Sequence, residues 1–280
     1  MSSVPRLVRR GLSAIIAATM AILLLPASAA RGSSGLPDSM ASMGDSITRG
    51  FNACGWYVDC PYRSFSTGGS GLVNSHYLRI LAKNPAIYGH NYNDARSGAK
   101  ASDMPAQAAT AAAQHVDYVT ILIGANDACT SSESTMTSVA AYRDSIDRAL
   151  ATLTTGLPNA RIAVISIPDV YHLWQVGHTN AAALSTWSLF RICQSMLYRA
   201  WSTSSTDEAR RQRVRQRVID YNAQLAEACA AYGSNCDFDD NAVFKYPFSL
   251  SQVSPWDYYH PSTSGQAKLA EVSFANGFSW

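Results

Sequence analysis

Two short segments at opposite ends of the chain carry side chains that together could transfer an acyl group. Residues 43–48 read Met-Gly-Asp-Ser-Ile-Thr, and the apolar stretch before them predicts a strand that ends in glycine, with Ser46 just beyond it. Residues 257–262 place Asp257 three positions before His260. An aspartate at this spacing can accept the Nδ1 proton of the histidine and leave Nε2 free to take the proton of a serine nucleophile. Alone, each segment is also typical of an ordinary turn or helix cap.

Two further segments between them supply groups that a serine hydrolase needs. Residues 93–98 end in Gly98, which has no side chain and therefore lets its backbone N–H come close to a bound substrate. Residues 124–127 include Asn126, which directly follows an apolar run. We expect Asn126 at the carboxyl edge of a sheet, where open α/β folds bind ligands. Alone, each of these two segments is also typical of an ordinary loop.

Together, and in this order, the four segments resemble the characteristic blocks of the GDSL/SGNH hydrolase superfamily. The family is named for Ser, Gly, Asn and His, which fall here on Ser46, Gly98, Asn126 and His260. The resemblance implies a flavodoxin-like three-layer α/β/α sandwich around a mostly parallel sheet. It also implies an oxyanion hole made by the Ser46 N–H, the Gly98 N–H and the Asn126 side chain. Asp257 matches the third member of the triad, although in some relatives a main-chain carbonyl orients the histidine instead.

The reaction that these residues predict is hydrolysis of a carboxylic ester through an acyl-Ser46 intermediate, with His260 as general base. This reaction requires no cofactor. We expect no metal site, because the chain has no C-x-x-C pair and no H-E-x-x-H motif. The G-x-S-x-G elbow of the α/β-hydrolase fold is absent as well. The chain looks most like the secreted bacterial lipase and phospholipase branch. The alternatives are a carbohydrate O-deacetylase, acyl transfer to an alcohol, and a secreted binding module without activity.

Apolar periodicity predicts that an α/β domain positions these residues. Residues 118–123 and 160–167 are nearly continuous apolar runs, typical of strands buried on both faces of a parallel sheet. A helical stretch precedes each run. The first, at residues 106–115, is alanine-rich, and the second, at residues 139–153, has an apolar stripe. Strands that alternate with helices indicate a parallel sheet with crossover connections.

A third helix is expected from residue 205 to a stop at Gly233, with Ser205 and Glu208 as a capping box. Its five arginines are interpreted as a solvated face, with contact to anionic lipid headgroups as the alternative.

Residues 169–201 are rich in aromatic side chains and fit no plain crossover. Core packing explains most of these side chains. The more specific alternative is that residues 169–201 line the substrate-binding site, because long connections in α/β domains often line the active site. Under that alternative, Trp174 and Phe190 line a groove for the acyl chain.

The first thirty residues are typical of a signal peptide that is cleaved near Ala29 or Ala30. Three arginines precede an apolar stretch of about 15 residues, which is shorter than the ~20 needed to span a bilayer as an anchor. The arginine pair leaves the twin-arginine export route open. We expect residues 31–39 to form a flexible lead-in and residues 40–280 to form a single extracellular hydrolase domain.

The charge of the expected mature chain is close to zero. The leader contains three basic residues and no acidic residue, so its removal leaves 19 Lys+Arg against 20 Asp+Glu. A near-neutral protein has no general attraction for nucleic acid. We therefore expect a monomer that acts on a small-molecule or lipid ester, with no nucleic acid and no obligatory protein partner.

All six cysteines lie after the leader, and an even number in an oxidising compartment suggests three disulfides. Six cysteines allow 15 pairings, among which the sequence does not choose with certainty. Proximity in the chain favours Cys54–Cys60 and Cys229–Cys236, which leaves Cys129–Cys193.

Overall fold

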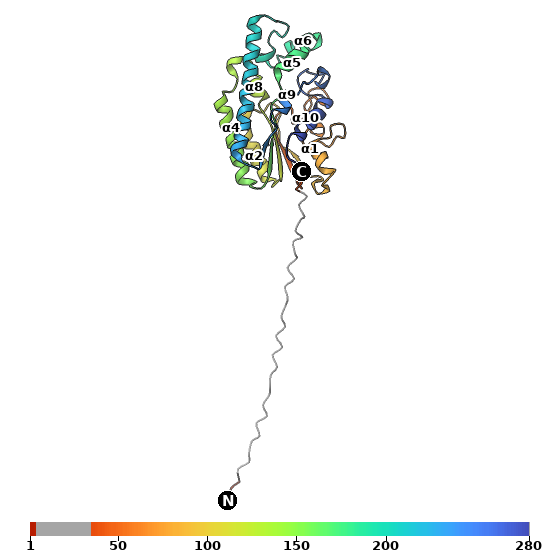
Figure 1. Ribbon diagram of the computed structural model, residues 1–280. Coiled ribbons are helices and arrows are strands. Elements are labelled where there is room, and N and C mark those ends of the chain that lie inside the picture. Colours follow the sequence, from red (N-terminus) through yellow and green to blue (C-terminus); the bar gives the residue numbers. More distant parts are fainter. Residues whose placement is uncertain (4–34, 280) are drawn as a thin grey trace. The chain divides into compact units, whose positions relative to one another are not determined.

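Nearly continuous apolar segments form the middle of a five-stranded parallel sheet. The computed structural model describes residues 1–3 and 35–279 (Figure 1). The predicted cleavage point and residues 31–34 of the lead-in lie outside the described residues. The strands are β1 (Met40–Gly44), β2 (Asn91–Asn93), β3 (Tyr118–Leu122), β4 (Arg161–Val164) and β5 (Cys236–Phe238). Their order in the sheet is β2-β1-β3-β4-β5, so the two strands that precede Ser46 and Asn126 are neighbours.

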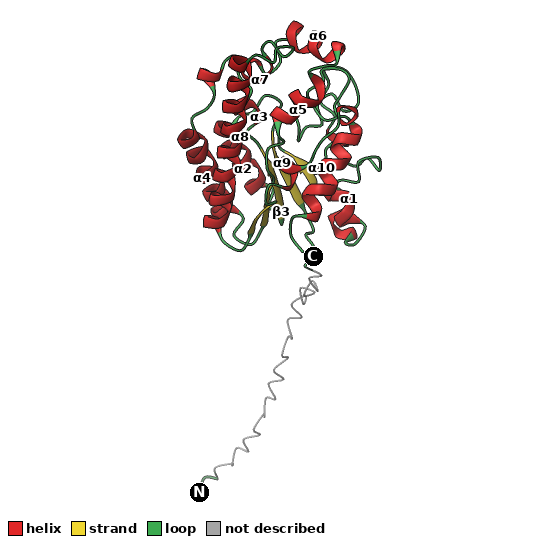
Figure 2. Cartoon of the chain, turned by 45° about the horizontal axis from the view of Figure 1, so that its top comes forward, coloured by secondary structure: helices red, strands yellow, loops and turns green. Residues whose placement is uncertain are grey.

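Helices cover both faces of this sheet and give a three-layer α/β/α sandwich (Figures 1 and 2). The helices are α1 (His76–Leu81), α2 (Met104–Ala113), α3 (Ala125–Ala128), α4 (Val139–Gly156), α5 (Val170–Gly177), α6 (Ala181–Leu189), α7 (Gln194–Leu197), α8 (Ser205–Tyr232), α9 (Ala242–Lys245) and α10 (Thr263–Ala275). Helices α2, α4 and α8 pack side by side on one face, and α1 and α10 lie on the other. This is the predicted fold class. None of the described helices is long and apolar enough to cross a membrane.

The central elements form where their apolar patterns predict them. Every residue of β1 and β3 is buried, as expected for strands that are covered on both faces. Helix α4 begins after Ser138, whose hydroxyl accepts the backbone N–H of Ala141 and so caps the helix. The predicted stripe of α4 faces the core through Tyr142, Ile146, Ala149, Leu150 and Leu153.

Helix α8 differs from the sequence-based expectation at its start. The prediction of a capping box at Ser205 and Glu208 is wrong. Ser204 caps the helix instead, and its side chain accepts the backbone N–H of Asp207. The Glu208 carboxylate instead pairs with Arg211 of the same helix at 3.2 Å.

The arginines of α8 form the solvated face that the sequence suggested only in part, since the Arg213 side chain is exposed over 58% of its surface. Arg211 is fully buried, with its guanidinium carbon 3.9 Å from the ring centre of Trp174. Arg215 pairs with Asp169 at 2.8 Å. An aromatic face and a nearby carboxylate replace the water that a charged side chain would otherwise keep.

Part of the expected flexible lead-in is attached to the domain. The Asp38 backbone N–H and the Ser39 hydroxyl both donate to the Asp117 carboxylate at 3.0 Å. Leu36 packs against a smaller apolar cluster that contains Met40 and Tyr118. The lead-in is therefore packed against the sheet from residue 36 onward.

Candidate active site

Ser46 lies just beyond the carboxyl end of β1, where the chain turns sharply. Gly44 has a φ of 153°, and a Cβ there would collide with the Thr48 hydroxyl and the Leu122 carbonyl, so the turn requires glycine. Gln107 of α2 fixes this strand end with its side-chain amide. It accepts the Gly44 N–H at 2.7 Å and donates to the Gly44 carbonyl at 2.9 Å. The backbone that carries Ser46 is thereby held from two sides.

Ser46, His260 and Asp257 form a continuous hydrogen-bonded chain. Ser46 Oγ lies 2.7 Å from His260 Nε2, and His260 Nδ1 lies 2.6 Å from Asp257 Oδ2. The other carboxylate oxygen accepts the backbone N–H groups of Tyr259 and His260 at 2.9 and 3.0 Å. One carboxylate thus holds both the turn and the imidazole ring, and it leaves Nε2 directed at the serine.

The Asp257 carboxylate is buried and is itself held by Asn52, whose Nδ2 donates to Oδ2 at 2.6 Å. Burial would raise the pKa of Asp257, but the hydrogen bond from the His260 ring and the charge of that ring lower the pKa below its usual value. An ionised carboxylate at neutral pH can orient the ring and stabilise positive charge on it. In this structure the group that holds the His260 ring is the carboxylate and not a main-chain carbonyl.

Gly98 and Asn126 line one polar cavity. The φ of Gly98 is 83°, a conformation that favours glycine. One N–H of the Asn126 amide donates to the Ala99 carbonyl at 3.0 Å, which leaves its second N–H for another acceptor. Among the described residues, neither the Ser46 N–H nor the Gly98 N–H donates a hydrogen bond. The site therefore retains donors of the kind that stabilise an oxyanion.

Asp45, between the strand and Ser46, carries a fully buried carboxyl group. Its Oδ1 accepts the Ile47 N–H at 2.9 Å, whereas its Oδ2 has no hydrogen-bond partner within residues 35–279. Burial raises the pKa of Asp45 to about 7, although the Ile47 N–H and the charge of His260 act in the opposite direction. This carboxyl group therefore titrates near neutral pH.

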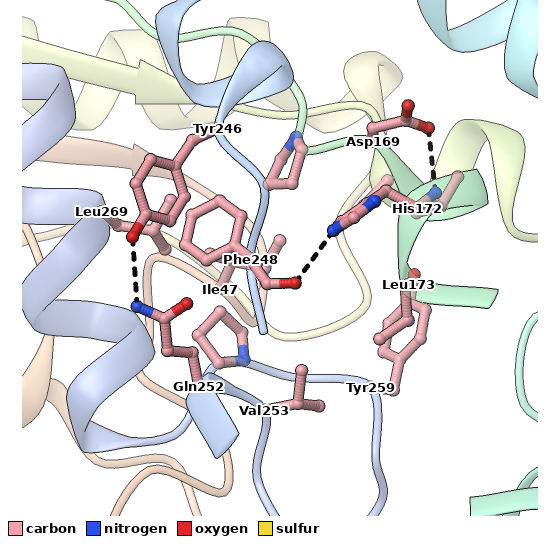
Figure 3. Close-up of a pocket in the computed structure, with 14 residues that line it drawn as sticks. Ile47, Asp169, His172, Leu173, Tyr246, Phe248, Gln252, Val253, Tyr259 and Leu269 are labelled. Carbon is pink, nitrogen blue, oxygen red and sulfur yellow. Dashed lines mark hydrogen bonds between the residues drawn. The ribbon is translucent and has the colours of Figure 1, made fainter. Parts of the chain in front are cut away.

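An apolar pocket of about 60 Å³ lies beside the turn that carries His260 (Figure 3). Tyr259 and Pro261, which flank His260, line it together with Ile47, the residue that follows Ser46. Further side chains come from α5, α10 and the segment after α9, namely Val170, Leu173, Leu269, Tyr246, Phe248 and Val253. The pocket is thus built on the same turns that carry the hydrogen-bonded chain.

The spacing of Asp257 and His260 recurs beside this pocket at Asp169 and His172 (Figure 3). There the Asp169 carboxylate caps α5 by accepting the backbone N–H groups of Tyr171 and His172. The His172 ring instead donates to the Phe248 carbonyl at 3.0 Å. The same local pattern therefore forms a helix cap at one position and a carboxylate–imidazole pair at the other.

The two aromatic residues expected in an acyl-chain groove have different environments. Trp174 is buried, its indole N–H donates to the Ala200 carbonyl at 2.8 Å, and its ring packs against Arg211. The groove interpretation is therefore corrected for Trp174, which belongs to the core. Phe190 is exposed over 43% of its surface, and its ring centre lies 6.0 Å from that of Tyr57.

Three disulfides are present, Cys54–Cys60, Cys129–Cys193 and Cys229–Cys236, and these are the pairs that proximity in the chain favoured. The bond between Cys129 and Cys193 joins the chain just after Asn126 to the aromatic segment. Ser195 reinforces this link, because its hydroxyl donates to the Ala128 carbonyl at 2.7 Å.

Polar residues that the sequence analysis did not select complete the framework, namely Asn52, Gln107 and Gln266. Gln266 of α10 accepts the Phe65 N–H at 2.9 Å and donates to the Ile47 carbonyl at 2.8 Å. The available signal was weak, since each of Gln107 and Gln266 is a single amide on the mainly apolar buried face of its helix. Within the described residues, no group of three or more His, Cys, Asp or Glu side chains could hold a metal ion.

Residues 40–272 match the family described as GDSL-like Lipase/Acylhydrolase, and the match contains every residue of the hydrogen-bonded chain. The chain belongs to this family. The family match therefore supports ester hydrolysis by this GDSL-like hydrolase. It does not identify the ester that the protein hydrolyses.

Solved structures share the fold of this GDSL-like hydrolase at low sequence identity. A variant of an acetyl-xylooligosaccharide esterase from Geobacillus stearothermophilus is 18% identical, with a TM-score of 0.52, over 86% of this chain and 95% of that chain. An extracellular lipase from Streptomyces rimosus is 18% identical, with a TM-score of 0.51, over 86% of this chain and 99% of that chain. No curated protein matches the chain.

Proposed function

We propose that this GDSL-like hydrolase is a secreted carboxylic-ester hydrolase of the lipase, phospholipase or esterase type. The observation that carries the proposal is the chain of short hydrogen bonds from Ser46 Oγ through the His260 ring to Asp257, 2.7 and 2.6 Å long. A serine hydroxyl becomes a nucleophile when an adjacent base can take its proton as the new bond forms. The family match supports the same chemistry.

In the first half of the proposed reaction, His260 Nε2 takes the Ser46 proton while Oγ attacks the ester carbonyl carbon. The negative charge that develops on the carbonyl oxygen is stabilised by the Ser46 N–H, the Gly98 N–H and the Asn126 side chain. When the tetrahedral intermediate collapses, the bond to the leaving alkoxide breaks and His260 returns the proton to that oxygen. The products of this half are the free alcohol and an ester between the acyl group and Ser46.

In the second half, a water molecule takes the place of the alcohol. His260 removes a proton from the water, whose oxygen attacks the acyl carbon, and the same donors stabilise the second oxyanion. Collapse of this intermediate breaks the bond to Ser46 Oγ, which regains a proton from His260. The carboxylic acid then leaves, so the cycle consumes one water molecule and no cofactor.

Secretion is part of the proposal and rests on the sequence of residues 1–30 and on the cysteines. Three disulfides persist most readily in an oxidising compartment. The similar lipase from Streptomyces rimosus is described as extracellular, which agrees with this expectation.

A fluorophosphonate probe and a panel of esters test the proposal. The probe should label the wild-type protein at Ser46, and it should not label the Ser46→Ala variant. The panel should contain nitrophenyl esters of increasing chain length, a triglyceride, a phospholipid and an acetylated xylooligosaccharide. Turnover of acyl esters supports the lipase or esterase branch, whereas turnover of the acetylated sugar alone favours a deacetylase. A folded protein that reacts with neither probe nor esters would refute the assignment.

A further inference from the structure

A group of exposed apolar side chains surrounds one side of the proposed active site. These residues, called the rim surface here, come from two segments that are distant in the chain: Trp56, Tyr57, Val58, Leu189 and Phe190. Trp56 and Tyr57 are exposed over 54% and 53% of their surface, and Leu189 over 76%. Grouped exposed apolar side chains on a soluble protein mark an interaction site more often than scattered ones do.

The rim surface is continuous with the hydrogen-bonded chain through a series of ring contacts. The Phe51 ring centre lies 4.9 Å from that of His260, and the Tyr57 ring centre lies 5.9 Å from that of Phe51. Tyr57 in turn contacts Trp56 and Phe190, at 5.0 and 6.0 Å between ring centres. Whatever covers the rim surface therefore reaches to the mouth of the site.

The two segments of the rim surface carry almost no charge. Residues 51–60 contain one charged side chain, Asp59, which pairs with Arg49 at 3.1 Å. Residues 181–198 contain one, Arg191. Disulfides fix both segments, since Cys54–Cys60 closes the first and Cys129–Cys193 anchors the second beside Asn126. A fixed apolar surface loses little conformational entropy when it is covered.

We propose that the rim surface docks this protein onto the surface of aggregated lipid, so that an ester can pass directly from the lipid to Ser46. The inference rests on the proposed ester hydrolysis. A protein partner seated on the rim would obstruct the approach of substrate, whereas a lipid aggregate covers the rim and supplies the ester at once. Tryptophan and tyrosine favour the boundary between lipid and water, because each combines an apolar ring with a polar group. The low charge implies docking that needs no anionic lipid.

Vesicle binding tests the docking step separately from catalysis. The protein is purified from culture medium as the Ser46→Ala variant, so that lipid is not consumed, and is sedimented with phosphatidylcholine vesicles. We expect Trp56→Ser/Leu189→Ser in this background to weaken vesicle partitioning by about tenfold or more, because both side chains lose apolar contact with lipid. Partitioning should change little between low and high salt.

Tyr88→Ser is the matched control. Tyr88 is 76% exposed and precedes β2, at the amino end of the strands and therefore opposite the edge that carries Ser46. This control should bind vesicles as the parent does. Equal binding by the parent and the rim variant would overturn the proposal.

Kinetics with Ser46 intact provide the second test. The rim variant should hydrolyse a dissolved short-chain nitrophenyl ester within about twofold of wild type, but a long-chain ester carried in vesicles about tenfold more slowly. Equal losses on both substrates would overturn docking. Binding to acetylated xylan and not to vesicles would also overturn it, in favour of a polysaccharide surface. If wild type binds vesicles through the rim but hydrolyses no ester, docking stands and the proposed function fails.

Discussion

Ser46 and the base beside it are 214 positions apart in the chain, yet their side chains meet at 2.7 Å. Because the serine proton must move to His260 as the acyl bond forms, the two residues act as a unit. We expect Ser46→Ala and His260→Ala each to remove essentially all turnover, and the double variant to be hardly worse than either. Steady-state kinetics with a nitrophenyl ester measure this. Additive losses would indicate a different base, and a Ser46→Ala protein with a tenth of wild-type activity would contradict the nucleophile assignment.

Substitution of Asn126 tests how the negative charge on the carbonyl oxygen of the substrate is stabilised. We expect Asn126→Ala to lower kcat by about 10²–10³ with little change in KM, the usual effect of deleting one oxyanion donor. The Asn126 amide also donates to the Ala99 carbonyl, so the melting temperature of the variant should be measured as a control. An effect confined to KM would contradict a role in the oxyanion hole.

Asp257 tests the orientation of the base. Because its carboxylate accepts the imidazole N–H, we expect Asp257→Asn to lower kcat by about 10⁴ through the wrong ring tautomer. Asn52→Leu removes the hydrogen bond that holds this carboxylate, together with the acceptor of the Tyr57 N–H, and should have a smaller effect on kcat. Wild-type activity in Asp257→Asn would reduce the site to a serine–histidine pair.

At the scale of the element, the turn after β1 carries both the proposed nucleophile and, directly before it, a carboxyl group that is fully buried. Asp45 has a pKa of about 7 in the folded protein and about 3.8 when unfolded. The folded state therefore binds a proton that the unfolded state releases between these values, so the contribution of Asp45 becomes less favourable as pH rises from about 4 to 7.

Asp45→Asn removes this titration while it keeps an oxygen for the Ile47 N–H. The variant should gain stability relative to wild type as pH rises, by up to about 4 kcal/mol at and above pH 7. Urea unfolding of both proteins at pH 5 and pH 8, the two conditions of this test, measures the change. A difference in unfolding free energy that is the same at both pH values would show that burial does not hold a proton on Asp45.

At the scale of the whole molecule, the disulfides differ in the length of chain that they close. Cys129–Cys193 closes 64 positions and Cys54–Cys60 only 6. In the chain-entropy model the long bond stabilises by about 4 kcal/mol and the short one by about 2. Because the long bond also fixes the loop after Asn126, Cys129→Ser/Cys193→Ser should lose kcat at temperatures where the protein is still folded. Cys54→Ser/Cys60→Ser should lose less.

Thermal melts recorded beside activity measure this difference, and peptide mapping verifies the pairing. Cys129 found joined to any residue other than Cys193 would end this interpretation. An unchanged kcat in the folded long-bond variant would show that the hydrogen bonds of Ser195 hold the loop without the disulfide.

The four chemical segments, the alternation of helices with buried strands, and the favoured cysteine pairs could be read from the sequence alone. Each depends on residue types and spacings within a short stretch of chain, where local geometry and hydrophobic periodicity carry the information. The edge strands β2 and β5 were not predicted, because three residues are too few to establish a period.

Contacts between distant segments were decided only by the tertiary structure. The spacing at Asp169 and His172 equals that at Asp257 and His260, and only the position of the second pair opposite Ser46 makes it a candidate for catalysis. Likewise, aromatic composition could not separate the buried Trp174 from the exposed Phe190. The physical reason is the same in both cases: the environment of a side chain is set by the elements that pack against it, and those come from elsewhere in the chain.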